Sequence, residues 1–475
     1  MHRSSLSALP LLALALIHCN NPMLIVDVDI DYLPPGTQRL LLVTTLNGQP
    51  GKEQRFSTDE RRVAVNLPTG ATGTVGLRVY GIDAGDCILS EGSLDAPVPI
   101  GLNRTEQFRV KMSSPSNARC SFTVLRTGLG GLVQPDLKAV WGSDANNVYV
   151  VGGGGQQGAP LDVMLRCVTD SAACSPLPAA AELAVGNVYW GAWGADASSI
   201  FVAHSSGQVV RCAADAGSCS AMISNGMRQP LRSIWGSDPE NVYAVGDKGF
   251  ILRCSGSTSR CNAMNPGDQS LSTHGFTQVW GRDSENVYVV GGNSDVAACQ
   301  SATNSSLVRC RAGSSDCVKF AIPSTISLCS VGGGDPQRVY SVGGSGTIVR
   351  CNPASNVCTK LNSGTTAHLY SVWSSDPDNV YAVGTNTIVR CQAGSDACTV
   401  LTHGATSTFR GVWGSDPQNV YVVGSGGVVV RCAAADRACA QVTSGTKSDL
   451  SAVYGTDSND VYIVGANGTI LRRRL

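Results

Sequence analysis

Residues 235–246 read Trp235-Gly236-Ser237-Asp238-Pro239-Glu240-Asn241-Val242-Tyr243-Ala244-Val245-Gly246, and close copies of this stretch recur along the chain. Eight copies occur between residues 139 and 464, with first positions about 40 to 52 residues apart. These first positions are Trp141, Trp193, Trp235, Trp280, Gly332, Trp373, Trp413 and Tyr454. A period near 40 residues made of short apolar runs and Gly-rich turns is typical of a β-propeller with one blade per repeat. The sequence therefore predicts an all-β fold dominated by an eight-bladed β-propeller.

Each repeat contains four candidate strands. In the third copy they begin with Leu231–Trp235, Asn241–Val245 and Gly249–Cys254, and the fourth strand of a repeat follows its second Cys. The second strand is almost entirely apolar, as expected for a strand between neighbouring blades. Gly and Pro recur too often for a helical alternative.

The two ends of the repeat region complement each other. The eighth repeat ends at Leu475 after its third strand, whereas residues 120–128, upstream of the first Trp, match the fourth strand of the other repeats. Pairing of these segments would close the ring and leave no free sheet edge. We therefore expect the propeller to span residues 120–475.

Residues 20–118 contain no copy of the repeat. Their apolar and polar residues alternate in short runs that are separated by turn signals such as Asn47-Gly48. The runs are Leu24–Ile30, Leu40–Leu46, Arg62–Leu67, Thr74–Tyr80, Cys87–Ser90 and Glu106–Met112. The pattern predicts a small β-sandwich, either immunoglobulin-like or transthyretin-like.

Residues 1–19 have the pattern of a targeting segment. An apolar run, Leu6–Ile17, is of signal-peptide length and too short to span a bilayer. It ends in Leu16-Ile17-His18-Cys19, which resembles a bacterial lipobox, with His18 where that family prefers a small residue. The resemblance implies that Cys19 is diacylated as the first mature residue and that Asn20 permits transport to the outer membrane. The alternative is an ordinary secretory signal, with a secreted or periplasmic product.

The cysteines independently favour export. The chain has 19, and seven pairs share the spacing C-x6-C. These pairs are Cys167/Cys174, Cys212/Cys219, Cys254/Cys261, Cys310/Cys317, Cys351/Cys358, Cys391/Cys398 and Cys432/Cys439. If Cys19 carries lipid, the even remainder fits an oxidised protein, and we expect further bridges Cys87–Cys120 and Cys299–Cys329. Structural zinc sites favour C-x2-4-C spacing with further Cys or His nearby, so no metal is expected.

An Asp in the first turn and an Arg at the end of the third strand recur in every repeat. The Asp residues are Asp144, Asp196, Asp238, Asp283, Asp335, Asp376, Asp416 and Asp457. The Arg residues are Arg166, Arg211, Arg253, Arg309, Arg350, Arg390, Arg431 and Arg472. Both fall at the same end of a blade, so one Asp–Arg pair per blade is expected. Eight equal copies favour a structural role over calcium binding or acid–base catalysis, which need one asymmetric constellation.

The Trp-Gly-Ser-Asp and Asn-Val-Tyr-Ala-Val-Gly stretches resemble the Asp-box and related repeats of secreted bacterial propellers. The resemblance covers residues 139–475. It implies turns that stabilise blades and that, in sialidases, lie away from the catalytic residues. It is specific for a fold and not for a substrate.

Other chemistry finds little support in the sequence. The total of 35 Lys and Arg equals the total of 35 Asp and Glu, with no basic stripe for nucleic acid. Residues 153–158 match G-x-G-x-x-G, but no helix pattern follows, so no dinucleotide site is expected. The chain has no HExxH or G-x-S-x-G motif, and His204, His274, His368 and His403 are scattered over the repeats. We expect no cofactor and no enzyme activity.

The loops differ between the two faces of the predicted ring. Turns between strands one and two and the C-x6-C loops are nearly uniform, whereas the connections on the opposite face vary in length. Variable loops on a rigid scaffold are where recognition usually resides. The candidate binding loop lies within Gly291–Ser306 and includes Asn293, Asp295, Gln300 and Asn304.

The favoured function is a lipid-anchored, exported, non-enzymatic propeller that binds a protein or glycan. The alternatives are a scaffold subunit of outer-membrane assembly machinery and an Asp-box-type glycoside hydrolase.

Overall fold

The structure is a computed structural model, and the chain divides into two compact units, Met1–Cys120 and Ser121–Leu475. In the first unit it describes residues 23–29, 33, 37, 39–59, 62–66, 72–82, 88–94, 97–99 and 106–112. In the second it describes residues 122–129, 134–155, 162–168, 171, 173–177, 188–213, 218–224, 228–292, 305–323, 327–335, 337–434, 438–458 and 460–474. No helix in these ranges is long and apolar enough to cross a membrane.

The first unit consists of two sheets. One has the order β4-β1-β8, and the other has the order β3-β2-β5-β6 with β7 paired to β5. The strands are β1 (Met23–Asp29), β2 (Arg39–Leu46), β3 (Gln49–Ser57), β4 (Arg62–Asn66), β5 (Thr74–Ile82), β6 (Ile88–Ser93), β7 (Val98–Pro99) and β8 (Glu106–Lys111). Leu40 and Leu42 of β2 pack with Val79 of β5 and with Val110 of β8, so both sheets contribute to one core.

The hairpin β2–β3 explains one strand that the sequence pattern missed. Asn47 and Gly48 both have positive φ, 54° and 79°, as a two-residue hairpin turn requires. Strand β3 then pairs with β2 although it is rich in polar residues and contains Pro50 and Gly51. Backbone pairing with β2 therefore outweighs the weak strand propensity of β3. The assignment to an immunoglobulin-like or transthyretin-like sandwich stays a prediction.

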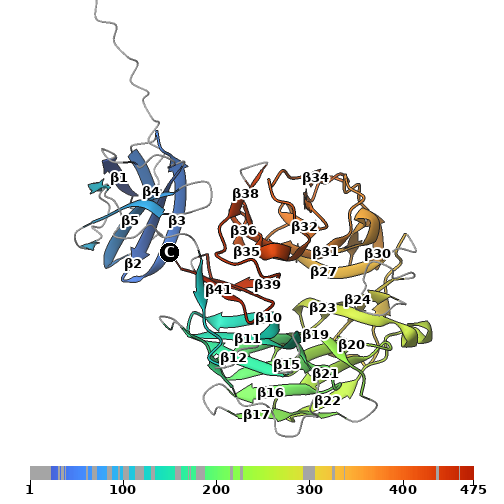
Figure 1. Cartoon of the computed structure of the whole chain (residues 1–475). Helices are drawn as coiled ribbons and strands as arrows, with labels where there is room; N and C mark the ends of the chain where they lie inside the picture. Colours follow the sequence, from blue (N-terminus) through green and yellow to red (C-terminus); the bar gives the residue numbers. More distant parts are fainter. Residues whose placement is uncertain are drawn as a thin grey trace, which may run out of the picture. The chain divides into compact units, whose positions relative to one another are not determined.

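In its described residues the second unit contains eight sheets, seven with four strands and one with five, and we number them as blades 1 to 8 (Figure 1). Blade 1 consists of β10 (Pro135–Asp144), β11 (Asn147–Gly155), β12 (Val163–Cys167) and β13 (Ser175–Pro176), and blade 2 consists of β14 (Tyr189–Asp196), β15 (Ser199–His204), β16 (Val209–Ala213) and β17 (Ser218–Ala221). Blade 3 consists of β19 (Leu231–Asp238), β20 (Asn241–Gly246), β21 (Ile251–Ser255) and β22 (Arg260–Ala263), and blade 4 consists of β23 (Gly275–Asp283), β24 (Asn286–Gly292), β25 (Ser306–Cys310) and β26 (Val318–Lys319). Blade 5 consists of β27 (Leu328–Asp335), β28 (Arg338–Gly343), β29 (Ile348–Asn352) and β30 (Val357–Lys360), and blade 6 consists of β31 (Leu369–Ser374), β32 (Val380–Gly384), β33 (Thr387–Cys391) and β34 (Thr399–Val400). Blade 7 consists of β35 (Phe409–Asp416), β36 (Asn419–Gly424), β37 (Val429–Cys432) and β38 (Cys439–Val442). Blade 8 is β39 (Leu450–Gly455), β40 (Asp460–Gly465), β41 (Ile470–Arg474) and β9 (Thr123–Leu125), and the short β18 (Ile223–Ser224) adds to blade 3. The prediction of an all-β propeller is confirmed.

The blades form a closed ring. The first strand of each blade contacts the first strand of the next, and β39 of blade 8 contacts β10 of blade 1. These first strands lie nearest the centre of the ring (Figure 1). The outer strand of blade 8 is β9, which pairs with β41 through Leu125↔Ile470 and Val124↔Leu471. The fourth strand of the last blade is thus supplied from upstream of the first blade.

The recurring Trp-Gly dipeptide is a contact between neighbouring blades. A Cβ added at Gly236 of blade 3 would lie 2.5 Å from the ring of Trp193 in blade 2, so only Gly leaves room for that ring. The same relation joins Trp141 to Gly194 and Trp413 to Gly455. The Trp rings are half-buried between blades.

Between blades 5 and 6 both residues of the Trp-Gly contact are replaced. Blade 5 has Gly332 at the Trp position, and the next blade has Ser374 where the others have Gly. With no Trp ring from blade 5, blade 6 has space for a side chain. This matched exception supports the steric reading of the Trp-Gly pair.

Candidate functional site

The turn Asp residues accept hydrogen bonds from their own turns. Asp238 accepts hydrogen bonds from the backbone N–H of Glu240 (2.9 Å), from Ser237 Oγ (2.8 Å) and from Asn241 Nδ2 (3.0 and 2.9 Å). The Oδ1 atom of Asn241 accepts from Arg253 (3.1 and 2.6 Å). The expected Asp–Arg pair is therefore wrong in this blade: an Asn amide lies between the two groups, because it can donate to one and accept from the other.

These hydrogen bonds affect the acidity of the turn carboxylates. Partial burial acts to raise the pKa of Asp238, but the bonds from Asn241, Ser237 and the turn backbone outweigh it, so the pKa lies below its ordinary value. The same balance lowers the pKa of Asp144 and Asp376. At neutral pH these groups are ionised structural acceptors.

Three blades depart from the pattern, and in blade 2 the Asn position is Ser199. In blade 8 the Asn position is Asp460, which accepts directly from Arg472 Nε at 2.7 Å, with both side chains only 6% exposed. In blade 5 the position is Arg338, which binds Asp335 at 2.9 Å.

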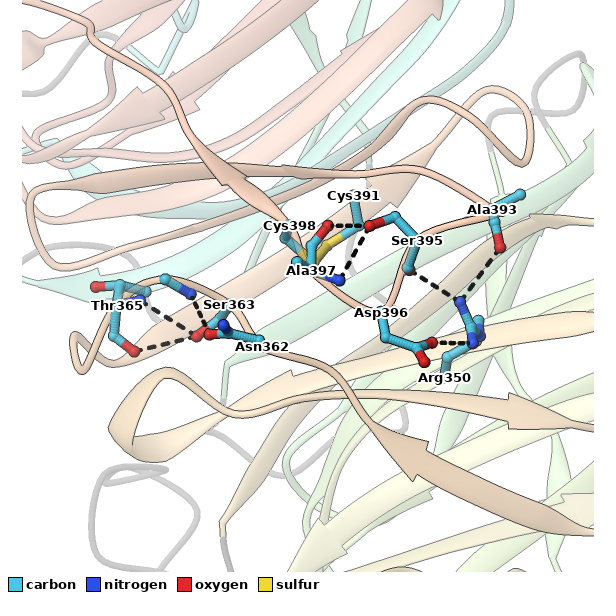
Figure 2. Close-up of a disulfide and its surroundings, with 11 residues drawn as sticks. Arg350, Asn362, Ser363, Thr365, Cys391, Ala393, Ser395, Asp396, Ala397 and Cys398 are labelled. Atoms are coloured by element: carbon cyan, nitrogen blue, oxygen red, sulfur yellow. Dashed lines mark hydrogen bonds and ion pairs between the residues drawn. A yellow bond between two sulfur atoms is a disulfide. The ribbon is translucent and has the colours of Figure 1, made fainter.

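In blades 2 to 6 the third-strand Arg also reaches the disulfide loop of the next blade. Arg350 of blade 5 donates to the carbonyl oxygens of Ala393 (3.3 Å) and Ser395 (3.1 Å) and to Asp396 Oδ1 (2.6 Å), beside the Cys391–Cys398 bridge (Figure 2). Equivalent bonds run from Arg211 to Gly256 O (2.6 Å), from Arg309 to Pro353 O (2.6 Å), from Arg390 to Ala434 O (2.8 Å) and from Arg253 to Ala312 O.

The structure contains a disulfide in each of the seven C-x6-C hairpins, with Cα–Cα distances of 3.9 to 4.3 Å. The bridges are Cys167–Cys174, Cys212–Cys219, Cys254–Cys261, Cys310–Cys317, Cys351–Cys358, Cys391–Cys398 and Cys432–Cys439. These are the pairs that the spacing predicts. One bridge therefore joins the third strand to the outer edge in each of blades 1 to 7.

The position of the second Cys relative to the fourth strand differs between blades. Cys174 and Cys317 precede β13 and β26, as the sequence pattern predicts. Cys219, Cys261, Cys358 and Cys439 instead lie within β17, β22, β30 and β38, so the expectation that the fourth strand follows the second Cys is wrong in blades 2, 3, 5 and 7. In those blades the two cysteines are directly opposed in the antiparallel ladder.

Each loop closed in this way also meets the preceding blade. Cys398 N donates to Asn362 O, and Asn362 N donates to Asp396 O, both at 2.8 Å. Parallel bridges of the same kind occur at Asn265↔Asp316 and Thr402↔Ala438. The Asp turns and the disulfide loops thus lie together at one end of the ring. We call this end the disulfide face.

The opposite end, which carries the connections from strand two to three and from strand four to the next blade, we call the connection face. Asn293, Asp295, Gln300 and Asn304 lie outside the described residues, as do Cys19, Cys87, Cys120 and Cys299. Cys329 is disulfide-bonded. The specific pairings Cys87–Cys120 and Cys299–Cys329 stay predictions.

A feature that the sequence analysis missed lies on the innermost strands. Every first strand has a register shift in its pairing with the second strand, around the residue three positions before the Trp position. The residues at this bulge are Lys138, Trp190, Arg232, Thr277, Cys329, Tyr370, Arg410 and Ser451, and we call them the bulge ring. A bulge releases one residue from the ladder and re-aims its side chain.

All eight bulge-ring residues are at least partly exposed, although a buried apolar residue precedes each of them. They lie on the innermost strands of a closed ring, and we call the centre of the ring that these strands surround the central channel. Arg232 binds Asp247 in the turn after β20, which places the bulge ring at the connection-face mouth of the channel. The chemistry changes from blade to blade at this one position, and that variation within the chain was the available sequence signal.

Cations and aromatic rings alternate in the bulge ring. Lys138 Nζ lies 5.7 Å from the ring centroid of Trp190, and the Arg232 guanidinium lies 5.1 Å from the same ring. On blades 6 and 7 the Arg410 guanidinium lies 5.5 Å from the ring of Tyr370. Such contacts are worth about 0.5 to 1 kcal/mol each at exposed sites and fix the plane of the cation.

Among the described residues, two of the pockets lie on the two faces of the ring. One of about 490 Å³ lies on the disulfide face between blades 3 and 4, but its charged groups hold the surrounding loops: Glu240 accepts from Ser255 and Ser257, and Arg253 is bonded as described above. The other, of about 390 Å³, lies on the connection face of blade 7, with Lys447 as its one charged lining residue.

The histidines do not form a site. His204 is buried on β15 with Nδ1 2.7 Å from Ser206 Oγ, and burial lowers its pKa. His274 lies near Ser306, and His403 packs edge-on to Phe409. In the described part of the chain, no three His, Cys, Asp or Glu residues gather in a group that could hold a metal ion.

Comparison with known proteins supports the fold. No protein-family model and no curated protein matches the chain. Among solved structures, the Dos1 propeller is 12% identical, with a TM-score of 0.57 over 74% of this chain and 95% of that one. The second unit is a β-propeller. The computationally designed Ika8 protein (14% identity, TM-score 0.56, 74% and 100% coverage) and YCF48 bound to D1 peptide (11%, 0.51, 76% and 100%) are also similar. At these identities the similarity concerns the fold of the propeller alone.

Proposed function

We propose that this protein is an exported, non-enzymatic propeller, anchored through Cys19, that binds a protein or glycan ligand on its connection face. The bulge ring carries this proposal: eight equivalent positions surround the channel mouth, and their side chains differ in charge, size and aromaticity. A rigid repeat scaffold that varies at one exposed position is suited to recognition.

The two faces support different roles. On the disulfide face the repeated Asp, Asn and Arg groups are engaged in turns and in bonds between blades, as for Asp238, Asn241 and Arg253. Their repetition fits stabilisation better than catalysis, which needs one asymmetric arrangement. This favours a binding protein over the Asp-box-type hydrolase.

The predicted Cys299–Cys329 bridge would link the candidate loop to the same mouth. Cys329 occupies the bulge of blade 5 and is disulfide-bonded. A partner at Cys299 would tether the loop of residues 293–304 beside the channel and reduce the ordering cost of binding.

Export agrees with the cysteine chemistry. Seven disulfides in the described residues indicate an oxidising environment. For the anchor, intact mass of membrane-extracted protein should show an acylated chain that begins at Cys19. An unmodified Cys19, or cleavage elsewhere, would remove the anchor from the proposal while leaving ligand binding open.

Ligand binding is tested with two matched variants. Ser451→Trp places a bulky neutral side chain in the channel mouth, and Gly394→Trp places the same side chain at an open position of the disulfide face. The lipid-free mature protein would be used for crosslinking to an envelope fraction and for a glycan array. We expect a ligand whose capture is lost with Ser451→Trp and kept with Gly394→Trp. The opposite pattern would place binding on the disulfide face, and absence of any saturable ligand would refute the function.

A further inference from the structure

The side chains of the bulge ring indicate one class of ligand, and this inference rests on the proposed binding function. We propose that the channel mouth binds an extended acidic peptide segment, whose carboxylates are received by Arg410 on one side and Arg232 on the other. Arg410, Tyr370, Arg232 and Trp190 are the residues that carry this site.

Arg410 is an exposed cation that is oriented and available. Its guanidinium stacks on Tyr370 at 5.5 Å, and no carboxylate partner is found for it among the residues the structure describes. Stacking fixes the guanidinium plane and leaves its N–H edge free. A carboxylate is the group that matches this edge, through two parallel hydrogen bonds.

Arg232 repeats the arrangement. It stacks on Trp190 at 5.1 Å, and its Nε and one terminal nitrogen lie 3.3 Å from the two oxygens of Asp247. Charge-assisted bonds are usually about 2.7 to 2.9 Å long, so the contact to Asp247 is loose. A ligand carboxylate can share or replace it.

The two aromatic–Arg couples face each other. Trp190 and Arg232 belong to blades 2 and 3, and Tyr370 and Arg410 belong to blades 6 and 7. In a closed ring of eight blades, positions four apart are diametrically opposite. A chain segment that enters the mouth therefore meets both couples at once, with the small Thr277 and Ser451 between them.

Other ligand classes fit this mouth less well. Both cationic neighbours of Trp190 lie over its ring, Lys138 at 5.7 Å and Arg232 at 5.1 Å, so the ring is engaged where a sugar would need to stack. Asp136 and Asp247 balance the charges of Lys138 and Arg232. The mouth thus lacks the excess of cations that a polyphosphate chain requires. Separate carboxylates along a polypeptide match Arg410, for which no carboxylate partner is found among the described residues, and Arg232, whose contact to Asp247 is exchangeable.

The test is selection of a displayed random dodecapeptide library on the lipid-free mature protein. We expect enriched peptides to carry two or more Asp or Glu residues. Synthetic copies of these peptides should lose about 10- to 100-fold in affinity with Arg410→Gln, the range expected for a hydrogen-bonded charge. Tyr370→Leu, which keeps the charge but removes the stacking ring, should give a smaller loss.

The matched control is Arg282→Gln, which removes the same charge from an exposed position on the disulfide face. It should leave peptide affinity unchanged, whereas an equal loss would assign the effect to net charge and overturn the site. Enriched peptides without carboxylates, or no enrichment at all, would also overturn the proposal. If a glycan or an intact protein still binds in a manner that Ser451→Trp blocks, the proposed function stands and only the peptide inference fails.

Discussion

Replacement of Gly236 by Ser is expected to destabilise the propeller through one contact. The new Cβ would lie 2.5 Å from Cζ3 and 2.6 Å from Cη2 of Trp193, distances at which the indole ring must move. The ring lies between two blades, so its displacement disturbs the packing of both. Overpacking of this kind costs about 1 to 3 kcal/mol.

The expected change in melting temperature follows from the size of the unit. With about 2.1 cal/mol/K of unfolding entropy per residue, a unit of about 355 residues loses about 1.3 °C in Tm per kcal/mol. Gly236→Ser should therefore lower Tm by about 1 to 4 °C, measured by circular dichroism with the disulfides intact. Gly394→Ser makes the same change where a Cβ meets nothing within 4 Å, and it should shift Tm by less than about 0.7 °C.

A double-mutant cycle decides whether Trp193 is the cause. In a Trp193→Ala background the ring is absent, as it naturally is between Gly332 of blade 5 and Ser374 of blade 6. Gly236→Ser should then cost less than about 0.5 kcal/mol, which gives a coupling energy of about 0.5 kcal/mol or more. An equal cost of Gly236→Ser in both backgrounds would refute the steric explanation of the Trp-Gly repeat.

Three further predictions concern stability. Replacing Cys391 and Cys398 with Ser should cost about 2.5 kcal/mol by loop entropy alone, seen as a lower urea midpoint; a midpoint unchanged from wild type would show that the bonds from Arg350 suffice to hold the loop. The pKa of Asp238 lies below its ordinary value, so its contribution is complete above about pH 4 and is lost as the pH falls through the folded-state value; Asp238→Asn should flatten this acid limb of the urea midpoint, and an unaltered limb would contradict the assignment. Burial raises the pKa of Tyr243 to about 12, so stability should be complete below about pH 10 and fall between about pH 10 and 12; a Tyr243→Phe variant that declines as steeply as wild type would speak against this.

The candidate site was only partly predictable from the sequence. The variable face was identified from loop lengths, but the bulge at Arg232 and its equivalents follows from strand register, which a run of apolar residues does not reveal. The stacking of Arg410 on Tyr370 joins two blades whose residues are 40 positions apart, and no local pattern pairs them. The chemical variation at the bulge was visible in the repeats, although its position in the channel was not.

The repeat turn shows a similar limit. Asp238 and Arg253 were expected to pair because both fall at one end of the blade. In the structure the side chain of Asn241 lies between them and is hydrogen-bonded to both. Sequence placed the three groups at one end of a hairpin. The choice among possible partners depends on side-chain reach and hydrogen-bond direction, which need coordinates.

The sequence by itself determined the features that arise within one repeat: strand order, the hairpin spacing that allows each C-x6-C pair to close, and the strand at residues 123–125 that completes blade 8. These depend on alternation, turn chemistry and cross-strand distance, which act over a few residues. The tertiary structure decided what lies between repeats, namely the Trp193 ring on Gly236, the hold of Arg350 on the next disulfide loop, and the opposed couples at the channel mouth. Those contacts exist only because the ring closes, and closure brings together residues whose separation along the chain carries no local signal.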